Sequence, residues 1–179
     1  MKKNIFIILN PDYQVPEWQY KCLLKIKHHN IVFLIANEIK GRDNAKLEKK
    51  YLKNFFYYII NIVSIRQKKV RINLNKFKNS SIKKIFFERK SNSWEELKKE
   101  SIKEIIAGRP NFIYKCGMGL LLINKELNNI PIISHHHGDP SKFIGRPAGF
   151  YELLKSENKL GQIVQLLSNK LDSGKILYY

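Results

Sequence analysis

Three consecutive histidines, His135, His136 and His137, follow a run of apolar residues and precede Gly138 and Asp139. Side chains that alternate along an extended backbone point to opposite faces. We therefore expect His136 to face one way and its two neighbours the other. A polar cluster followed by glycine and proline is a poor core element and suits a functional site.

Imidazoles in this position allow three interpretations. The cluster could be a solvated surface loop, or a metal site completed by Asp139 and Asp172, since neutral imidazole is the commonest metal ligand. It could also perform acid–base and electrostatic catalysis through one histidine and a carboxylate. Adjacent histidines diverge, whereas structural zinc sites space their ligands along the chain. We therefore favour catalysis and expect no metal.

A second cluster of interest is glycine-rich, from Cys116 through Gly117 and Gly119 to Leu121. Glycines let the backbone approach a ligand or another strand closely. The two cysteines, Cys22 and Cys116, lack metal-like spacing. A reduced, cytoplasmic chain is the simplest interpretation.

Elements of an α/β fold must position these clusters. Apolar runs at residues 5–9 and 31–35 predict buried strands, and Pro16 begins a helix between them that carries Trp18 and Cys22 on its apolar face. Strand, helix and strand at this spacing indicate a parallel sheet. We expect a Rossmann-like, open and mainly parallel sheet with helices on both faces. Ligands of such sheets collect beyond the carboxyl ends of the strands, where the histidines lie.

Residues 43–67 predict a long helix, for which packing against the sheet is favoured over a membrane surface. Residues 70–81 are polar and predict a loop. Ser93 and Glu96 form a capping-box pattern that predicts a helix ending at Gly108. Further strands are expected at residues 82–87, 112–114, 130–133 (ending where the histidines begin), 161–167 and 175–179.

The order and spacing of these motifs resemble the folate-dependent formyltransferases, which include methionyl-tRNA, glycinamide ribonucleotide and nucleotide-sugar members. In that family a strand ends in Asn-x-His, a glycine follows nine residues later, and Leu-Asp-x-Gly completes the pattern. Here Ser134 and His136 end the strand and Gly145 lies nine residues after His136. Leu171-Asp172-Ser173-Gly174 places its aspartate 36 residues after His136, the family's usual interval. The resemblance is strongest over residues 94–179, and the segment after Gly138 looks most like members linked to surface-sugar modification.

The resemblance implies transfer of a formyl group from 10-formyltetrahydrofolate to an amine. His136 would stabilise the developing oxyanion, and Asp172 would orient His136 or a water and help to move the proton. The catalytic set that the resemblance implies is His136, Asp172 and Ser134. The expected folate-side residues are Cys116, Gly117, Met118, Gly119, Leu120, Asn169 and Gly174. The expected substrate-side residues are His135, His137, Asp139, Gly145 and Arg146.

One residue departs from the family pattern, because Ser134 stands where the best-studied members have asparagine. A serine hydroxyl can donate one hydrogen bond but is shorter than an amide. Either His135 or His137 compensates, or the site is built differently. Asp139 could pair with a neighbouring histidine, or Gly138-Asp139 could form a turn that orients His136.

The net charge of +18 comes mainly from lysines spread along the chain. It would attract anionic partners such as nucleotide-sugars, but nucleic-acid sites more often cluster Arg and Lys with aromatics, so such a role is not favoured. No stretch reaches the ~20 apolar residues of a membrane span.

We expect one catalytic domain over residues 1–179, without the C-terminal domain of the tRNA-modifying members, able to form a homo-oligomer. The preferred acceptor is a nucleotide-linked amino sugar. The alternatives are methionyl-tRNA formyltransferase-like activity, a basic binding module that has lost turnover, and, least favoured, a metal-dependent hydrolase.

Overall fold

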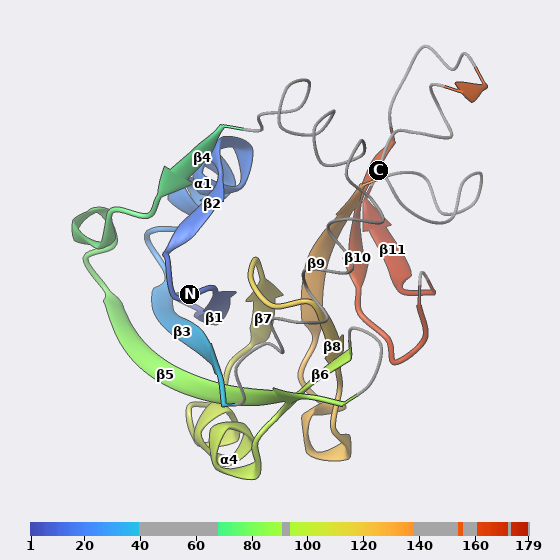
Figure 1. Cartoon of the computed structure of the whole chain (residues 1–179). Coiled ribbons are helices and arrows are strands. Elements are labelled where there is room, and N and C mark those ends of the chain that lie inside the picture. Colours follow the sequence, from blue (N-terminus) through green and yellow to red (C-terminus); the bar gives the residue numbers. More distant parts are fainter. Residues whose placement is uncertain (40–67, 91–93, 138–153, 156–160, 172, 179) are drawn as a thin grey trace.

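The computed structural model describes residues 1–39, 68–90, 94–137, 154–155, 161–171 and 173–178. Nine strands form one sheet in the order β11-β10-β9-β7-β1-β3-β5-β6-β8, and β2 pairs with β4 separately (Figure 1). The strands are β1 Asn4–Leu9, β2 Gln14–Pro16, β3 Asn30–Glu38, β4 Lys69–Arg71, β5 Ser80–Arg89, β6 Trp94–Leu97, β7 Phe112–Lys115, β8 Leu120–Leu122, β9 Ile132–His137, β10 Gln162–Leu166 and β11 Lys175–Tyr178. The helices are α1 Glu17–Lys25 and α4 Lys99–Ala107, with 3₁₀ turns η1 Leu74–Lys76 and η2 Lys125–Leu127.

The sheet is mainly parallel, as the sequence predicts. Parallel pairs join β1 to β3 and β7, β3 to β5, β7 to β9 and β6 to β8. Antiparallel pairs occur where β6 joins β5 and where β10 and β11 extend the sheet beyond β9. The sheet curls strongly, which brings β6 and β8 round toward β9 and β10 (Figure 1). The ends of the curl are joined through the Asn169 side chain, which hydrogen-bonds the backbone of Ile123 just after β8.

Helices cover both faces of the sheet, which confirms the predicted arrangement. Ile5, Ile7 and Leu9 of β1 pack on the face that carries α1. Phe6 and Ile8 pack on the face that carries α4. Because both faces are covered, β1 is apolar at nearly every position. We refer below to the α1 face and the α4 face.

The prediction that a helix begins at the Ser93–Glu96 capping box is wrong for its first turn. Residues 94–97 form β6, and α4 begins at Lys99. The backbone of β6 is paired on both sides, with β5 and with β8, so its hydrogen bonds are satisfied by strands distant in sequence. Tertiary pairing therefore overrides the local capping signal. The end of the helix at Gly108 is confirmed, and Ser93 lies outside the described residues.

Three other expectations change. Residues 70–81 are not a plain loop, because β4 pairs with β2 and both Ile72 and Phe77 are buried. The strand before the histidines does not end at them: β9 continues to His137, since β10 pairs alongside it. Cys22 is exposed on α1 rather than on its buried face. The helix expected at residues 43–67 lies entirely outside the described residues.

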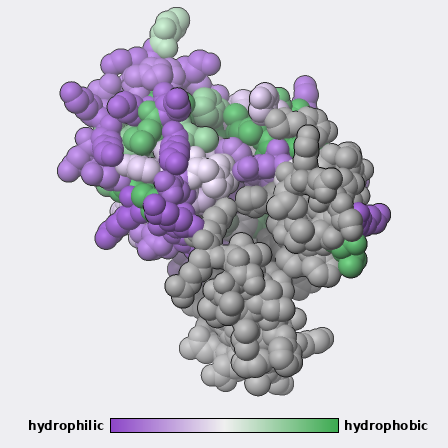
Figure 2. Space-filling view, turned by 90° about the horizontal axis from the view of Figure 1, so that it is seen from above, coloured by the Kyte–Doolittle hydropathy of each residue, from purple (hydrophilic) through white to green (hydrophobic). Residues whose placement is uncertain are grey.

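Hydrophilic residues cover much of the described surface seen from above, with small apolar groups between them (Figure 2). Exposed lysines occur in the middle and at the C-terminal end of α1, on α4 and on β11, which agrees with a charge spread over the molecule. Of the helices that the structure describes, none combines the length and the hydropathy that a membrane crossing requires.

Candidate functional site

The histidines belong to β9, so their side chains alternate between the two faces of the sheet. Ile132 packs on the α4 face and Ile133 on the α1 face. By the same alternation Ser134 and His136 project to the α4 face, and His135 to the α1 face. Contacts with aromatic residues place His135 on the α1 face, and the strand geometry of β9 directs His136 to the opposite face. The side chain of His137 lies outside the described set.

His135 is held by aromatic side chains of the α1 face. Its Nδ1 lies 2.6 Å from the Tyr114 hydroxyl, and its ring meets Trp18 edge-on at 4.5 Å between centroids. Burial raises the pKa of Tyr114 above its ordinary value, so this hydroxyl keeps its proton and can donate it to Nδ1. A neutral His135 would then carry its own proton on Nε2. Because it faces away from Ser134, His135 cannot replace the amide absent at that position.

Ser134 is buried on the α4 face next to a second buried polar residue. It is register partner to Gln165 of β10, and the two residues are only 6% and 7% exposed. A Cβ placed on Gly174 would come within 2.6 Å of both Gln165 Oε1 and the Leu166 carbonyl oxygen. Gly174 therefore packs tightly against β10, the strand next to Ser134, and only glycine fits at this position. Asp172 itself lies outside the described residues.

Lys115, the last residue of β7, is a feature that the sequence analysis did not select. It is the register partner of Ser134 across the parallel β7–β9 pair. Its Nζ donates to the carbonyl oxygen of Met118 at 3.4 Å. The available signal was a single lysine at the end of the apolar segment Phe112-Ile113-Tyr114, directly before the glycine-rich cluster.

The glycine-rich cluster folds as a tight loop over the end of β1. Both Cys116 and Gly117 donate backbone N–H groups to the Ile8 carbonyl oxygen. A Cβ on Gly117 would lie 2.5 Å from the Asn10 nitrogen, which confirms the expected close backbone approach for this glycine. Met118 adopts a φ of 67°, and its N–H donates to Asn10 Oδ1 at 2.9 Å.

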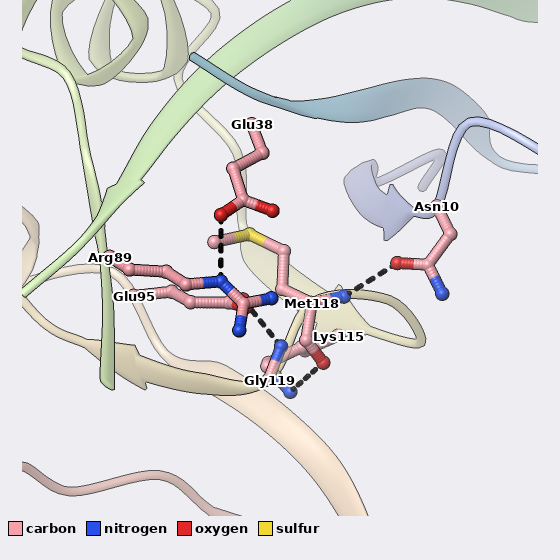
Figure 3. A network of polar contacts seen from close by, with 7 residues as sticks. All are labelled: Asn10, Glu38, Arg89, Glu95, Lys115, Met118 and Gly119. Atoms are coloured by element: carbon pink, nitrogen blue, oxygen red, sulfur yellow. Dashed lines mark hydrogen bonds and ion pairs between the residues drawn. The ribbon is translucent and has the colours of Figure 1, made fainter. Parts of the chain in front are cut away.

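A buried carboxylate holds the other side of this loop. Glu95 is 4% exposed, and its Oε2 accepts the N–H of Gly119 (Figure 3). Its Oε1 lies 3.5 Å from Arg89 Nη2, and Arg89 Nε donates to Glu38 Oε1 at 2.7 Å. Arg89 thereby partners the charge of a carboxylate that would otherwise be costly to bury. Hydrogen bonds to Asn10 at the end of β1 and to Glu95 of β6 therefore hold the loop from two sides.

The remaining folate-side residues have different surroundings. Burial raises the pKa of the Cys116 thiol to about 12, so it stays protonated at neutral pH. Leu120 begins β8. The Asn169 amide accepts from the Ile123 N–H at 2.6 Å and donates to the Ile123 carbonyl oxygen at 2.8 Å. Its side chain therefore already serves as a link between β8 and the segment after β10.

Several predicted site residues lie outside the described part of the chain, namely Asp139, Gly145, Arg146 and Asp172. Over the part that is described, no three His, Cys, Asp or Glu side chains are grouped so as to hold a metal ion. That observation does not reach the two aspartates of the metal hypothesis. The structure places Lys115 of β7 beside Ser134 of β9, which also carries His136. The glycine-rich loop follows β7, and Gly174 packs against Gln165, the β10 partner of Ser134.

No family model matches the sequence, and no curated protein matches it. Fourteen chains of solved structures match the fold. Glycinamide ribonucleotide transformylase 1 from Symbiobacterium toebii shares 12% identity at a TM-score of 0.52, over 98% of this chain and 71% of that one. Phosphoribosylglycinamide formyltransferase from Anaplasma phagocytophilum shares 14% identity at a TM-score of 0.54, over 99% and 70% of the two chains. Formyltetrahydrofolate deformylase from Burkholderia mallei shares 12% identity at 0.54, over 99% of this chain and 53% of its own. The chain thus has the fold of these one-carbon enzymes.

Proposed function

We propose that the protein transfers a formyl group from 10-formyltetrahydrofolate to a primary amine. The observation that carries this proposal is the position of Ser134 and His136 on β9, between β7, which leads into the glycine-rich loop, and β10, against which Gly174 packs. These segments are far apart in sequence and carry the motifs that resemble the formyltransferases. The solved structures with the same fold include two formyl-transfer enzymes and a formyltetrahydrofolate deformylase.

In the proposed reaction the amine nitrogen attacks the formyl carbon attached to N10 of the folate. The formyl oxygen gains negative charge, and His136 stabilises it as a hydrogen-bond donor. The bond from carbon to N10 then breaks. The proton lost by the amine goes to N10, and Asp172 assists that transfer through His136 or a water.

The proposed acceptor is the amine of a nucleotide-linked amino sugar. The chain's net charge of +18 favours an anionic, phosphate-bearing substrate over a neutral one. The two formyl-transfer neighbours are named for a ribonucleotide substrate, which has the same combination of amine and phosphate. One neighbour is a formyltetrahydrofolate deformylase, so water is included as a comparison acceptor in the test below.

The second candidate function is that of a folate-binding protein that has lost turnover, because the shorter Ser134 hydroxyl stands in place of an amide. Such a protein would bind folate without transferring the formyl group. Equilibrium titration with a folate analogue, followed by turnover, separates the two. If the folate analogue does not bind at millimolar concentration, both candidate functions are contradicted.

The direct test is a screen of 10-formyltetrahydrofolate with several nucleotide-linked amino sugars and a water-only reaction, with mass spectrometry of the products. His136→Ala should reduce formyl transfer by ~100–1,000-fold, the usual effect of losing one oxyanion donor. His28→Ala, at an exposed position before β3, is the matched control and should retain activity. Full activity in His136→Ala would refute the assigned role.

A further inference from the structure

Lys115 links two parts of the proposed site, the glycine-rich loop and Ser134 of β9. It ends β7, directly before the glycine-rich loop, and its backbone pairs with Ser134 of β9. Nothing in the motif pattern pointed to a lysine here, since the strand is otherwise apolar from Phe112 to Tyr114.

The face on which Lys115 projects follows from its neighbours. Ile113 packs on the α4 face and Tyr114 on the α1 face, so alternation directs Lys115 to the α4 face. Register partners in a sheet project to the same side, with strands about 4.8 Å apart. Lys115, Ser134 and His136 therefore form a contiguous group, with His136 one same-face position farther along β9.

The direction of the lysine side chain is set by its contact with the loop. Its Nζ donates to the Met118 carbonyl oxygen at 3.4 Å (Figure 3). Met118 is itself fixed through Asn10, and Gly119 through the buried Glu95. The ammonium thus lies against a restrained part of the loop, while its backbone belongs to the strand pair that carries Ser134.

We infer that Lys115 is a catalytic residue of the formyl transfer, donating a charged hydrogen bond to the formyl oxygen as that oxygen becomes negative. This inference rests on the proposed function. It explains how a site with serine in place of asparagine can retain a donor, since an ammonium carries three donors and a full charge. Charge-assisted hydrogen bonds are about twice as strong as neutral ones.

The electron and proton balance of the step is unchanged by this role. The amine's nitrogen–carbon bond forms, the carbon–N10 bond breaks, and the amine proton passes to N10. Lys115 keeps its proton throughout and stabilises only the transient negative charge on oxygen. The nearby buried carboxylate of Glu95 is already engaged by Arg89 and Gly119.

The test uses the whole chain with 10-formyltetrahydrofolate and hydroxylamine, a small amine whose formylated product gives a coloured iron complex. Lys115→Met removes the charge at similar length, and Lys115→Arg retains it. Lys103→Met, on the exposed side of α4, is the matched control. Folate-analogue affinity and the midpoint of thermal unfolding are measured for every variant.

We expect kcat to fall by ~100–1,000-fold in Lys115→Met, with folate-analogue Kd changed by less than threefold, and a smaller fall in Lys115→Arg. The control should match the wild type. A kcat within threefold of wild type in Lys115→Met overturns the inference while leaving the proposed function standing. Loss of folate binding with unchanged kcat overturns it too, because the lysine would then act in ground-state binding. A wild-type chain that turns over neither hydroxylamine nor any of the screened amino sugars overturns the proposed function, and this inference with it.

Discussion

Removal of the Glu95 carboxylate should loosen the glycine-rich loop. Glu95 is 4% exposed and is the acceptor for the Gly119 N–H. In Glu95→Ala this N–H loses its partner, and Arg89 retains only Glu38. In Glu95→Gln the acceptor oxygen remains, although the charge is lost. The two variants therefore separate the hydrogen bond from the ion pair.

The expected magnitude follows from these contacts. A hydrogen bond to a charged group contributes about 1.5–3 kcal/mol. The Arg89 side chain is 41% exposed, so solvent screening limits the ion pair to about 0–1 kcal/mol. Glu95→Ala should cost about 2–4 kcal/mol of unfolding free energy, and Glu95→Gln about 1 kcal/mol. For a chain of this length, each 1 kcal/mol shifts Tm by roughly 2–4 °C, which predicts a loss of about 4–16 °C for Glu95→Ala.

Urea unfolding and thermal scans measure these changes, with folate-analogue titration as the functional readout. Glu100→Ala, at an exposed position in the first turn of α4, is the control and should cost less than about 1 kcal/mol. Folate affinity should weaken in the order wild type, Gln, Ala. A Glu95→Ala variant as stable as Glu100→Ala would refute the reasoning, since the buried carboxylate would then be no part of what holds the loop.

Two further predictions concern residues on the folate side. Asn169→Ala should lose about 1–2 kcal/mol of unfolding free energy, because its two hydrogen bonds to Ile123 are removed, while the Kd for the folate analogue stays within threefold. Asn129→Ala is the exposed control. A tenfold weaker Kd at unchanged stability would instead assign Asn169 to the cofactor site. For Cys116, burial raises the folded pKa to about 12 against an ordinary 9.0, so the unfolded chain releases this proton first and stability falls as pH rises from about 9 toward 12. Urea unfolding from pH 8 to 10.5 should show a flatter decline in Cys116→Ala than in wild type, and equal slopes would contradict the buried thiol.

The sequence was sufficient for features that depend on local pattern. The apolar run at residues 5–9 predicts a strand covered on both faces, and it is β1, the centre of the sheet. The helix after Pro16 and the parallel pairing of the flanking strands follow equally from local periodicity. Opposite directions for His135 and His136 were also predictable, because side-chain alternation is a property of any extended backbone.

Only the tertiary structure decided which distant residues share a face and what they contact. Trp94–Leu97 becomes a strand because β5 and β8 lie on either side of it, although its own sequence favours a helix start. Lys115 joins the site because β7 and β9 pair in a register that sets it beside Ser134. Glu95 tolerates burial because Arg89 and Gly119 are folded against it. Each of these outcomes depends on a partner that is separate in sequence, so no local pattern contains it.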